Sequence, residues 1–314
     1  MAPPTLPAPK LTISHSPLTP SSFHPFGTAI SKPLPQSLNR TPPPSSLPSL
    51  ANTNPTTTPD FPVPTLANQS TALKYSPIST FQNNYDQSKS ADGGMGKAGE
   101  PRMSMFSCFP RQLRRGGRER GRKAKAGGGL FDVGILERHP YTTQTFVPLG
   151  VPGPAERRRQ GTSSASTVRD DKRQGTSTST GIKDDDYGTD DNTPPASYLV
   201  IVAPSLHGQK VEATVFNPEG RNETVVVRDP PDLRNLKAFV AHGGQAVTYG
   251  AGTWHAPMVV VGRHRVDFVV VQFSNGVAED DCQEVVFGDG LVVDVDVDVD
   301  VREKEAYEDE CSKL

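Results

Sequence analysis

Cysteines, long apolar runs and an excess of either charge are all scarce in this chain of 314 residues. The three cysteines, Cys108, Cys282 and Cys311, are odd in number and widely spaced. This usage is typical of a reducing compartment and excludes a zinc ribbon. No apolar run approaches the length of a membrane span, and the opening MAPPTLPAPK lacks the basic and then apolar order of a secretory signal. The net charge of −2 implies no general attraction to nucleic acids or membranes.

Apolar side chains are also scarce, since hydrophobic residues make up 34% of the chain, beside 31 prolines and 28 glycines. Much of the chain therefore lacks the apolar surface that a folded core needs. The length would allow two domains, but the composition predicts one domain with disordered insertions. We expect a disordered N-terminus over residues 1–10, one domain over 11–290, an acidic tail over 291–314, and insertions at about 33–64, 111–129 and 153–192.

Two charged segments each have a functional and a plain interpretation. Arg111–Lys125 gathers arginines that would neutralise phosphates of a nucleic acid. No aromatic residue lies within it to stack on bases, so a solvated loop is favoured. Val292–Val301 alternates valine with aspartate, which is a strand pattern. Repulsion between its carboxylates makes a tail the favoured interpretation.

The most informative stretch is Gly244–Pro257, which reads GQAVTYGAGTWHAP. Glycine tolerates a positive φ without steric cost, so Gly244, Gly250 and Gly252 favour tight turns between strands. The flanking segments AFVAH, MVVVG and VDFVVVQF are rich in β-branched and aromatic residues. Such runs predict buried strands rather than a helix. The strand after the turn would carry His255.

Other segments predict the remaining elements. Leu11–Ile30 is expected to form an edge strand, a short turn or helix, and a second strand. Thr19 before Pro20 is a good helix start, and Phe23 and Phe26 would pack that helix onto the domain. Strands are also expected at Asn68–Tyr75, at Met103–Phe109 and at SYLVIVAP, which starts at Ser197.

The spacing of Gly244, Gly250, Gly252 and His255 resembles the second signature of the cupin β-barrel, with Gly250 in place of its proline. Longer blocks resemble one cupin-like family, the ureidoglycolate lyases. These blocks are LTPSSFHPFGTAI, LERHPYTTQTFVPLG, NLKAFVAHGGQAVTYGAGTWHAP and DFVVVQFSNGVAEDDCQEV. The resemblance implies a mainly β, cupin-like (RmlC-like) antiparallel barrel. It also implies a homodimeric lyase that cleaves ureidoglycolate to glyoxylate and urea in the breakdown of purines through allantoin.

A candidate metal site follows from the same resemblance. Cupins usually carry a first signature with two histidines and a glutamate, and its places hold Glu137, His139 and Gln144 here. Alternate residues of a strand share a face, so Glu137 and His139 would lie together. With Gln144 and His255 they form a mixed nitrogen and oxygen set, which suits nickel, manganese or iron better than a structural zinc. Nickel is associated with bacterial members of the family. A hydrogen-bond network without a metal is the open alternative.

Cleavage of ureidoglycolate needs a base, an acid and a group that neutralises negative charge on oxygen, but no covalent nucleophile. His255 or His139 is expected to transfer the proton. Lys237 is expected to bind the substrate carboxylate, because the family often carries a basic residue there. The expected hydrogen-bond partners of the substrate are Gln144 and Gln245, and the expected walls are Tyr249 and Trp254. The alternatives are another cupin enzyme, a dioxygenase or sugar-acid isomerase, and a cupin-like binding protein without activity.

The last three residues, Ser312, Lys313 and Leu314, match the signal that the peroxisomal import receptor recognises. We therefore expect this receptor as a partner and the peroxisome as the location. Oxidation of urate, which lies upstream in the same breakdown of purines, commonly occurs there.

Overall fold

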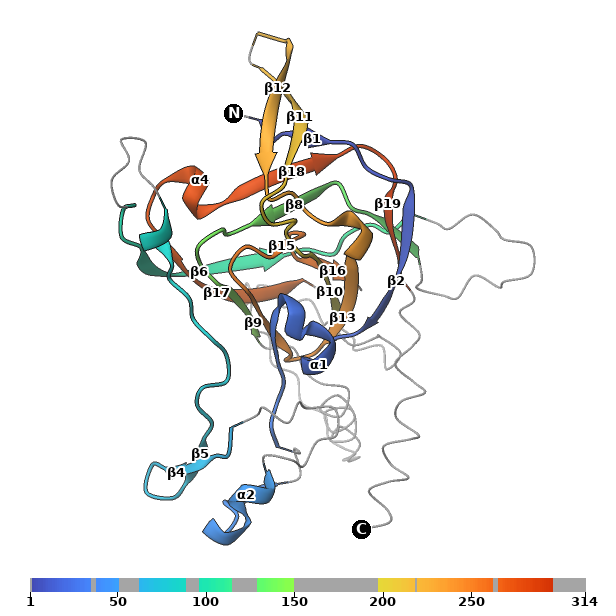
Figure 1. The fold of residues 1–314 in the computed structure, drawn as a ribbon. Helices are drawn as coiled ribbons and strands as arrows, with labels where there is room; N and C mark the ends of the chain where they lie inside the picture. Colours follow the sequence, from blue (N-terminus) through green and yellow to red (C-terminus); the bar gives the residue numbers. More distant parts are fainter. Residues whose placement is uncertain are drawn as a thin grey trace, which may run out of the picture.

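Figure 1 shows the computed structural model, which describes residues 2–34, 38–50, 62–88, 96–114, 129–149, 197–217, 219–261 and 265–295. The insertion expected at 153–192, most of the one at 111–129 and the signal Ser312–Leu314 lie outside these residues. No helix among the described residues is long and apolar enough to cross a membrane.

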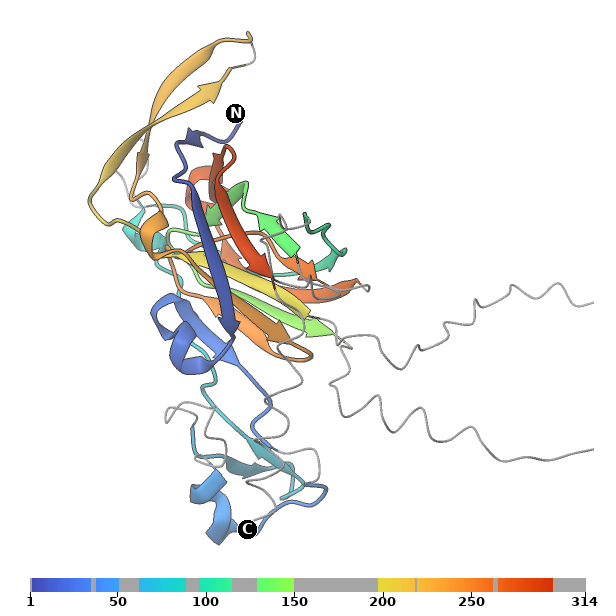
Figure 2. The same ribbon diagram turned by 90° about the vertical axis from the view of Figure 1, so that its right-hand side faces the viewer.

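The larger of two main sheets has a central strand, β10, with buried residues along its whole length. Its strands lie in the order β12 (Asn222–Arg228), β11 (Lys210–Phe216), β1 (Thr5–Leu6), β18 (Gln283–Phe287), β8 (Ile135–Arg138), β15 (Trp254–His255), β10 (Ser197–Ala203), β13 (Lys237–His242), β2 (Leu11–Pro17), β19 (Leu291–Val295) and β7 (Gly129–Asp132), with β16 (Val259–Val261) also paired to β10. The β11–β12 hairpin projects from one end of the molecule (Figure 2).

The smaller sheet is antiparallel throughout and has the order β3 (Gly27–Ile30), β14 (Ala246–Tyr249), β9 (Gln144–Leu149), β17 (Val266–Ser274) and β6 (Glu100–Cys108). The helices are short: α1 (Pro20–Phe23), α2 (Leu47–Leu50), α4 (Ala278–Asp281) and the 3₁₀ turns η1 (His24–Phe26), η2 (Pro44–Ser46), η3 (Tyr85–Gln87) and η4 (Leu233–Asn235). This architecture confirms the predicted mainly β, cupin-like fold.

Two cores lie on opposite faces of β10, because alternate side chains of a strand point to opposite faces. Tyr198, Val200 and Val202 pack with residues of the smaller sheet such as Phe146 and Phe268. The alternate residues Leu199, Ile201 and Ala203 pack in a second, mainly aliphatic core. That second core includes Phe131 of β7 and Val285 of β18, which are far apart in the strand order. The larger sheet therefore curls around it.

The N-terminal segment confirms the predicted helix start. The Thr19 hydroxyl accepts a hydrogen bond from the Ser22 amide, and Pro20 occupies the first turn of α1. Phe23 and Phe26 are buried against Phe239. The expectation of an edge strand before the helix is wrong, because β2 lies between β13 and β19 and runs parallel to both.

Both ends of the predicted domain extend further than the composition suggested. Leu6 of β1 is buried where this strand pairs with β18 and β11, within the segment expected to be disordered. β19 takes in the start of the expected acidic tail, and Leu291, Val293 and Val295 are buried. The apolar side of the Val-Asp alternation meets the aliphatic core, and this burial outweighs the repulsion between carboxylates.

The expected strand at Asn68–Tyr75 is a separate hairpin instead. β4 (Thr65–Ala67) pairs only with β5 (Ala72–Lys74) among the described strands, and Asn68, Gln69 and Ser70 between them have positive φ. Figures 1 and 2 both place this hairpin and α2 away from the two main sheets. Within the insertion expected at 33–64, η2 and α2 are formed.

Candidate active site

Two rows of side chains lie on the facing sides of the two sheets. Residues directly opposite each other on paired strands share a face of the sheet. The large-sheet row consists of Lys237, Val202, His255, Glu137 and Glu284, in that order. The small-sheet row consists of Tyr249, Gln144, Gln272 and Arg102. Val202 and Tyr249 belong to the core between the sheets, so both rows face inward.

His255 joins the two rows. Its Nε2 lies 3.3 Å from Glu137 Oε1 in its own row and 3.1 Å from Gln144 Oε1 in the other. The ring of Tyr249 stacks on the imidazole with 3.9 Å between ring centres. The Gln144 amide donates to Gln272 Oε1 at 2.6 Å. The structure thus places one histidine between a carboxylate, an amide oxygen and an aromatic wall.

His139 completes the group from the residue that follows β8. Its ring centre is 5.6 Å from that of His255. Glu137, His139 and His255 each offer a ligand atom, and these atoms lie within 4.8 Å of one another. His139 Nε2 is buried and makes no hydrogen bond of good geometry among the described residues, although the Gln144 side chain lies near this imidazole. A buried polar atom without a partner is costly, and it commonly marks the place of a ligand, an ion or a water.

Both histidines are held in the same manner. His139 Nδ1 contacts the backbone carbonyl of Asp281, and His255 Nδ1 lies 3.1 Å from the backbone carbonyl of Thr253. When Nδ1–H donates to such a carbonyl, Nε2 keeps its lone pair, as in histidines that bind metals. For His139 this aims a lone pair at the site. His255 Nε2 instead faces two acceptor oxygens, Glu137 Oε1 and Gln144 Oε1, and donates to them unless an ion takes the place of its proton. With Glu137 and the Gln144 oxygen, the predicted set therefore fits a divalent transition metal.

Asp281 anchors the segment that orients His139, and the sequence interpretation missed it. Its carboxylate accepts four hydrogen bonds of 2.7–2.8 Å, from the hydroxyls of Tyr85 and Ser274 and the backbone amides of Asn275 and Gly276. The Tyr85 side chain is 1% exposed, so these bonds tie the loop to a buried ring. The one hint in the sequence is the carboxylate run Glu279–Asp281 shortly after Asn275-Gly276, a typical turn pair.

The charge states follow from burial and from the neighbouring groups. Burial opposes ionisation of Glu137, but the hydrogen bond with His255 and the nearby imidazoles outweigh it, so the pKa of this carboxyl is lowered. Burial, and then the neighbouring His255, lower the pKa of His139. Glu137 is therefore ionised and His139 neutral near pH 7. Burial, followed by the charge of Glu137, raises the pKa of Cys282 to about 12, so this neighbouring thiol is no nucleophile.

Two of the predicted site residues, Trp254 and Gln245, lie away from the group around His255. Trp254 is on the opposite face from His255, in the aliphatic core, where its Nε1 donates to the Asp229 carbonyl at 3.0 Å. Gln245 lies beyond the far end of β14, where its side-chain amide donates to the Leu18 carbonyl at 2.9 Å and its Oε1 accepts from the His242 amide at 2.9 Å.

Lys237 is in the large-sheet row, but it is exposed, and the buried Val202 separates it from His255. The sequence could show that Trp254 and His255 point in opposite directions, but not that a second core lies behind the sheet.

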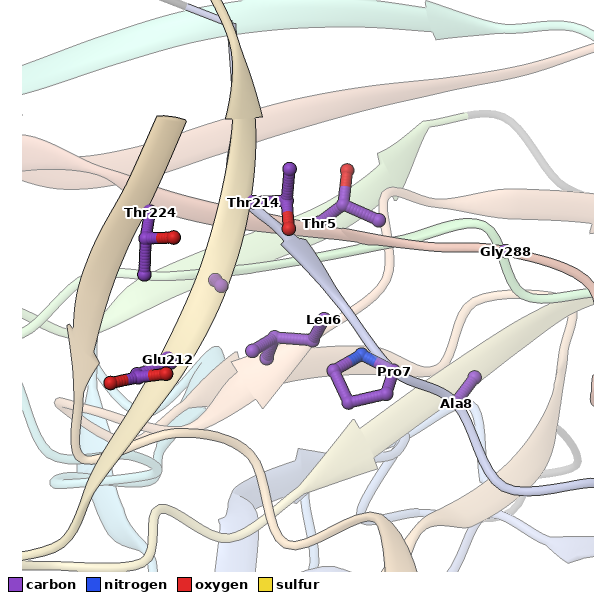
Figure 3. A pocket seen from close by; sticks show the side chains of 9 residues that line it. Thr5, Leu6, Pro7, Ala8, Glu212, Thr214, Thr224 and Gly288 are labelled. Atoms are coloured by element: carbon purple, nitrogen blue, oxygen red, sulfur yellow. The ribbon is translucent and has the colours of Figure 1, made fainter. Parts of the chain in front are cut away.

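Two hollows lie outside the group of Glu137, His139, Gln144 and His255. One, of about 520 Å³, lies between β1 and β11 (Figure 3) and is lined by small and apolar side chains with one carboxylate, Glu212. It offers no imidazole for proton transfer. The other, of about 510 Å³, reaches Cys282 and Glu284. Ligand atoms of these two residues lie within 4.8 Å of that of Glu137, so this hollow borders the group at one end.

Comparison with known proteins gives a consistent result. The family model described as ureidoglycolate lyase matches residues 10–294. The ureidoglycolate lyase of Schizosaccharomyces pombe is 31% identical over 217 residues, which are 69% of this chain and 74% of that protein. The protein of the same name from Saccharomyces cerevisiae is 29% identical over 72% of this chain and 80% of its own length. That of Pseudomonas syringae pv. syringae is 34% identical over 52% of this chain and 56% of its own.

Proposed function

Because the chain belongs to the ureidoglycolate lyase family, we propose that it cleaves (S)-ureidoglycolate to glyoxylate and urea, as a carbon–nitrogen lyase in the breakdown of purines through allantoin. The observation that carries this proposal is the buried group of Glu137, His139, Gln144 and His255, in which one imidazole nitrogen has no partner. A group of this kind suits proton transfer to and from a small polar substrate.

The reaction sets clear demands on the site. One carbon of the substrate carries a hydroxyl, a carboxylate and a urea nitrogen. The bond between this carbon and the nitrogen breaks, the hydroxyl oxygen becomes the carbonyl of glyoxylate, and its proton is lost. The leaving nitrogen takes up a proton to form urea. No atom changes oxidation state overall and no covalent intermediate is needed, which agrees with the protonated thiol of Cys282.

The Glu137–His255 pair can meet both proton demands. Its heteroatoms are 3.3 Å apart, and the lowered pKa keeps Glu137 ionised and able to accept a proton near pH 7. The pair takes the proton of the substrate hydroxyl and returns it to the leaving nitrogen. The carboxylate has two oxygens, so one can stay on His255 while the other meets the substrate.

A divalent metal would be held by Glu137 Oε1, His139 Nε2 and His255 Nε2, with the Gln144 oxygen beside them. It would take the place of the proton between Glu137 and His255, and the second oxygen of Glu137 would then accept the substrate proton alone. When bound, it would supply Lewis-acid stabilisation of the negative charge that develops on the substrate oxygens. The Asp281 carbonyl keeps His139 in the orientation that this role needs.

The amides of Gln144 and Gln272 suit the urea end of the substrate. They hydrogen-bond each other at 2.6 Å in the small-sheet row, and each amide offers donors and acceptors that match a urea group. Tyr249 forms the floor below His255, because its ring is fully buried and stacked on the imidazole.

Purified protein incubated with (S)-ureidoglycolate should release urea and glyoxylate in equal amounts and no ammonia. Ammonia in place of urea would indicate an amidohydrolase and overturn the proposal.

The Glu137→Gln variant should lower turnover by about 10²–10⁴-fold, since the substitution removes the base. Treatment with a chelator, followed by metal analysis and readdition of nickel or manganese, tests the metal separately from the reaction.

A homodimer and residence in peroxisomes stay predictions. Sedimentation would test the first. Imaging of a fluorescent protein fused to the N-terminus, with and without Ser312–Leu314, would test the second.

A further inference from the structure

Both rows become more exposed from the buried His255 and Tyr249 toward Glu284 and Arg102. In the large-sheet row, His255 is 1% exposed, the Glu137 side chain 19%, and Glu284 is exposed. In the small-sheet row, Tyr249 is 1% exposed and Gln144 5%, Gln272 is partly exposed, and the Arg102 side chain is 60% exposed. The two rows therefore reach solvent at Glu284 and Arg102, and at the other end the buried Val202 and Tyr249 separate the site from the exposed Lys237.

The end at Glu284 and Arg102 is rich in carboxylates, although the proposed substrate is itself a carboxylate. Glu137 and Glu284 offer oxygens that lie, with Cys282, within 4.8 Å of one another. An acidic entrance repels an anion unless a cation faces it. Arg138 cannot serve, because it lies on the opposite face of the sheet and its guanidinium is engaged there. Lys237 is exposed at the other end of the large-sheet row, and the buried Val202 separates it from His255.

The pairing of the strands in the smaller sheet places the guanidinium of Arg102 at the exposed end of its row. Arg102 pairs directly with Gln272, which pairs with Gln144, the residue in contact with His255. We propose that Arg102, and not Lys237, binds the carboxylate of the substrate and so selects substrates that carry a carboxylate. This inference rests on the proposed function for the identity of the substrate.

The distances and the chemistry of arginine suit this role. Arg102 is two strand spacings from Gln144, about 10 Å, which an arginine side chain and a small acid can span together. Its Nη2 lies 3.9 Å from Glu100, a contact between two exposed groups that contributes little, so a ligand displaces it at small cost. The planar guanidinium can donate two parallel hydrogen bonds to one carboxylate, which a lysine cannot do.

The test compares Arg102→Gln, Arg102→Lys and Arg265→Gln. Arg265 is a matched control, because its side chain is 54% exposed and it lies next to the opposite end of β17, beside Asp267. A bidentate charged contact predicts that Arg102→Gln raises the KM for ureidoglycolate, and the inhibition constant of the product glyoxylate, by about 10- to 100-fold. Arg102→Lys should recover only part of this loss, and inhibition by urea, which has no carboxylate, should not change.

Two outcomes would overturn the assignment: unchanged constants in Arg102→Gln, or equal weakening of glyoxylate and urea, which indicates a general disturbance of the site. Calorimetric binding of glyoxylate to the wild type and Arg102→Gln does not require turnover. If the wild type binds glyoxylate and the variant does not, Arg102 is a carboxylate site even if ureidoglycolate is not cleaved. If both bind it equally well, Arg102 is excluded while the proposed function stands.

Discussion

Arg138 and His139 are neighbours in the sequence, each is 5% exposed, and they lie in opposite environments. Arg138 faces the aliphatic core and makes five hydrogen bonds, to the Gln283 amide oxygen, the Ser205 hydroxyl and the carbonyls of Arg228 and Asp229. Its guanidinium also lies 4.8 Å from the ring centre of Trp254. His139 has one nitrogen held by a carbonyl, and the other has no partner among the described residues.

The difference separates structural from functional polar groups. A buried polar group with all its hydrogen bonds made costs little and fixes one arrangement of the chain, whereas a buried group left without a partner costs stability. The neighbouring strand β15 shows the same division between faces, since Trp254 Nε1 donates to the Asp229 carbonyl in the aliphatic core while His255 faces the site. Burial alone thus does not identify the site. What marks it is a buried atom without a partner beside other potential ligand groups, as at His139 Nε2 next to Glu137 and His255.

The largest expected effect is on stability, from Arg138→Met. This change removes a buried charge and leaves the carbonyls of Arg228 and Asp229 without their donor, so we expect a loss of about 3–5 kcal/mol in the free energy of unfolding. Urea denaturation measures it. His139→Ala on the other face is the control, and a larger loss there than in Arg138→Met would reverse the comparison.

A smaller effect is expected from Asp281→Asn, which disturbs four hydrogen bonds to a carboxylate. We expect a loss of about 2 kcal/mol in the free energy of unfolding at pH 7. Because this Asp supports His139 from outside the site, turnover should fall as well, and Asp281→Glu should recover it only in part.

The same variant has a defined dependence on pH. Burial opposes ionisation of Asp281, but its hydrogen bonds, led by those from Ser274 and Asn275, outweigh it and lower the pKa below the ordinary 3.8. Its contribution is therefore complete above the ordinary value and is lost as the pH falls through the lowered one. The stability gap between wild type and Asp281→Asn should shrink below about pH 4. A gap that is constant from pH 7 to pH 3 would contradict this assignment.

Trp254→Phe should cost still less, about 1–2 kcal/mol, because it removes one hydrogen bond and weakens the contact with Arg138. Turnover by the folded variant should remain at the wild-type level. A large loss of turnover without loss of stability would return Trp254 to the site, as the sequence suggested.

Lys237→Gln should have the smallest effect. Lys237 is exposed and the buried Val202 separates it from His255, so we expect less than about 0.5 kcal/mol in stability and no measurable change in KM. An increase in KM matching that of Arg102→Gln would show that the substrate carboxylate lies at the other end.

The sequence predicted those parts of the site that depend on local pattern. Alternation within one strand brought Glu137 and His139 together, and the glycine spacing marked His255. Gln272, Arg102 and Asp281 were not found, because their positions relative to Gln144 and His139 depend on which distant segments lie together and in what register. Composition also suggested tails at β1 and β19, where a few apolar residues in a charged or proline-rich context complete the aliphatic core.

The most direct test of the account is the turnover of (S)-ureidoglycolate by His255→Ala, measured on protein shown to be folded by circular dichroism, beside Trp254→Phe. The account predicts that His255→Ala loses about 10²–10⁴-fold in turnover, while its neighbour on the opposite face keeps wild-type activity. Wild-type turnover in folded His255→Ala protein would contradict the assignment of the site to this face of the sheet.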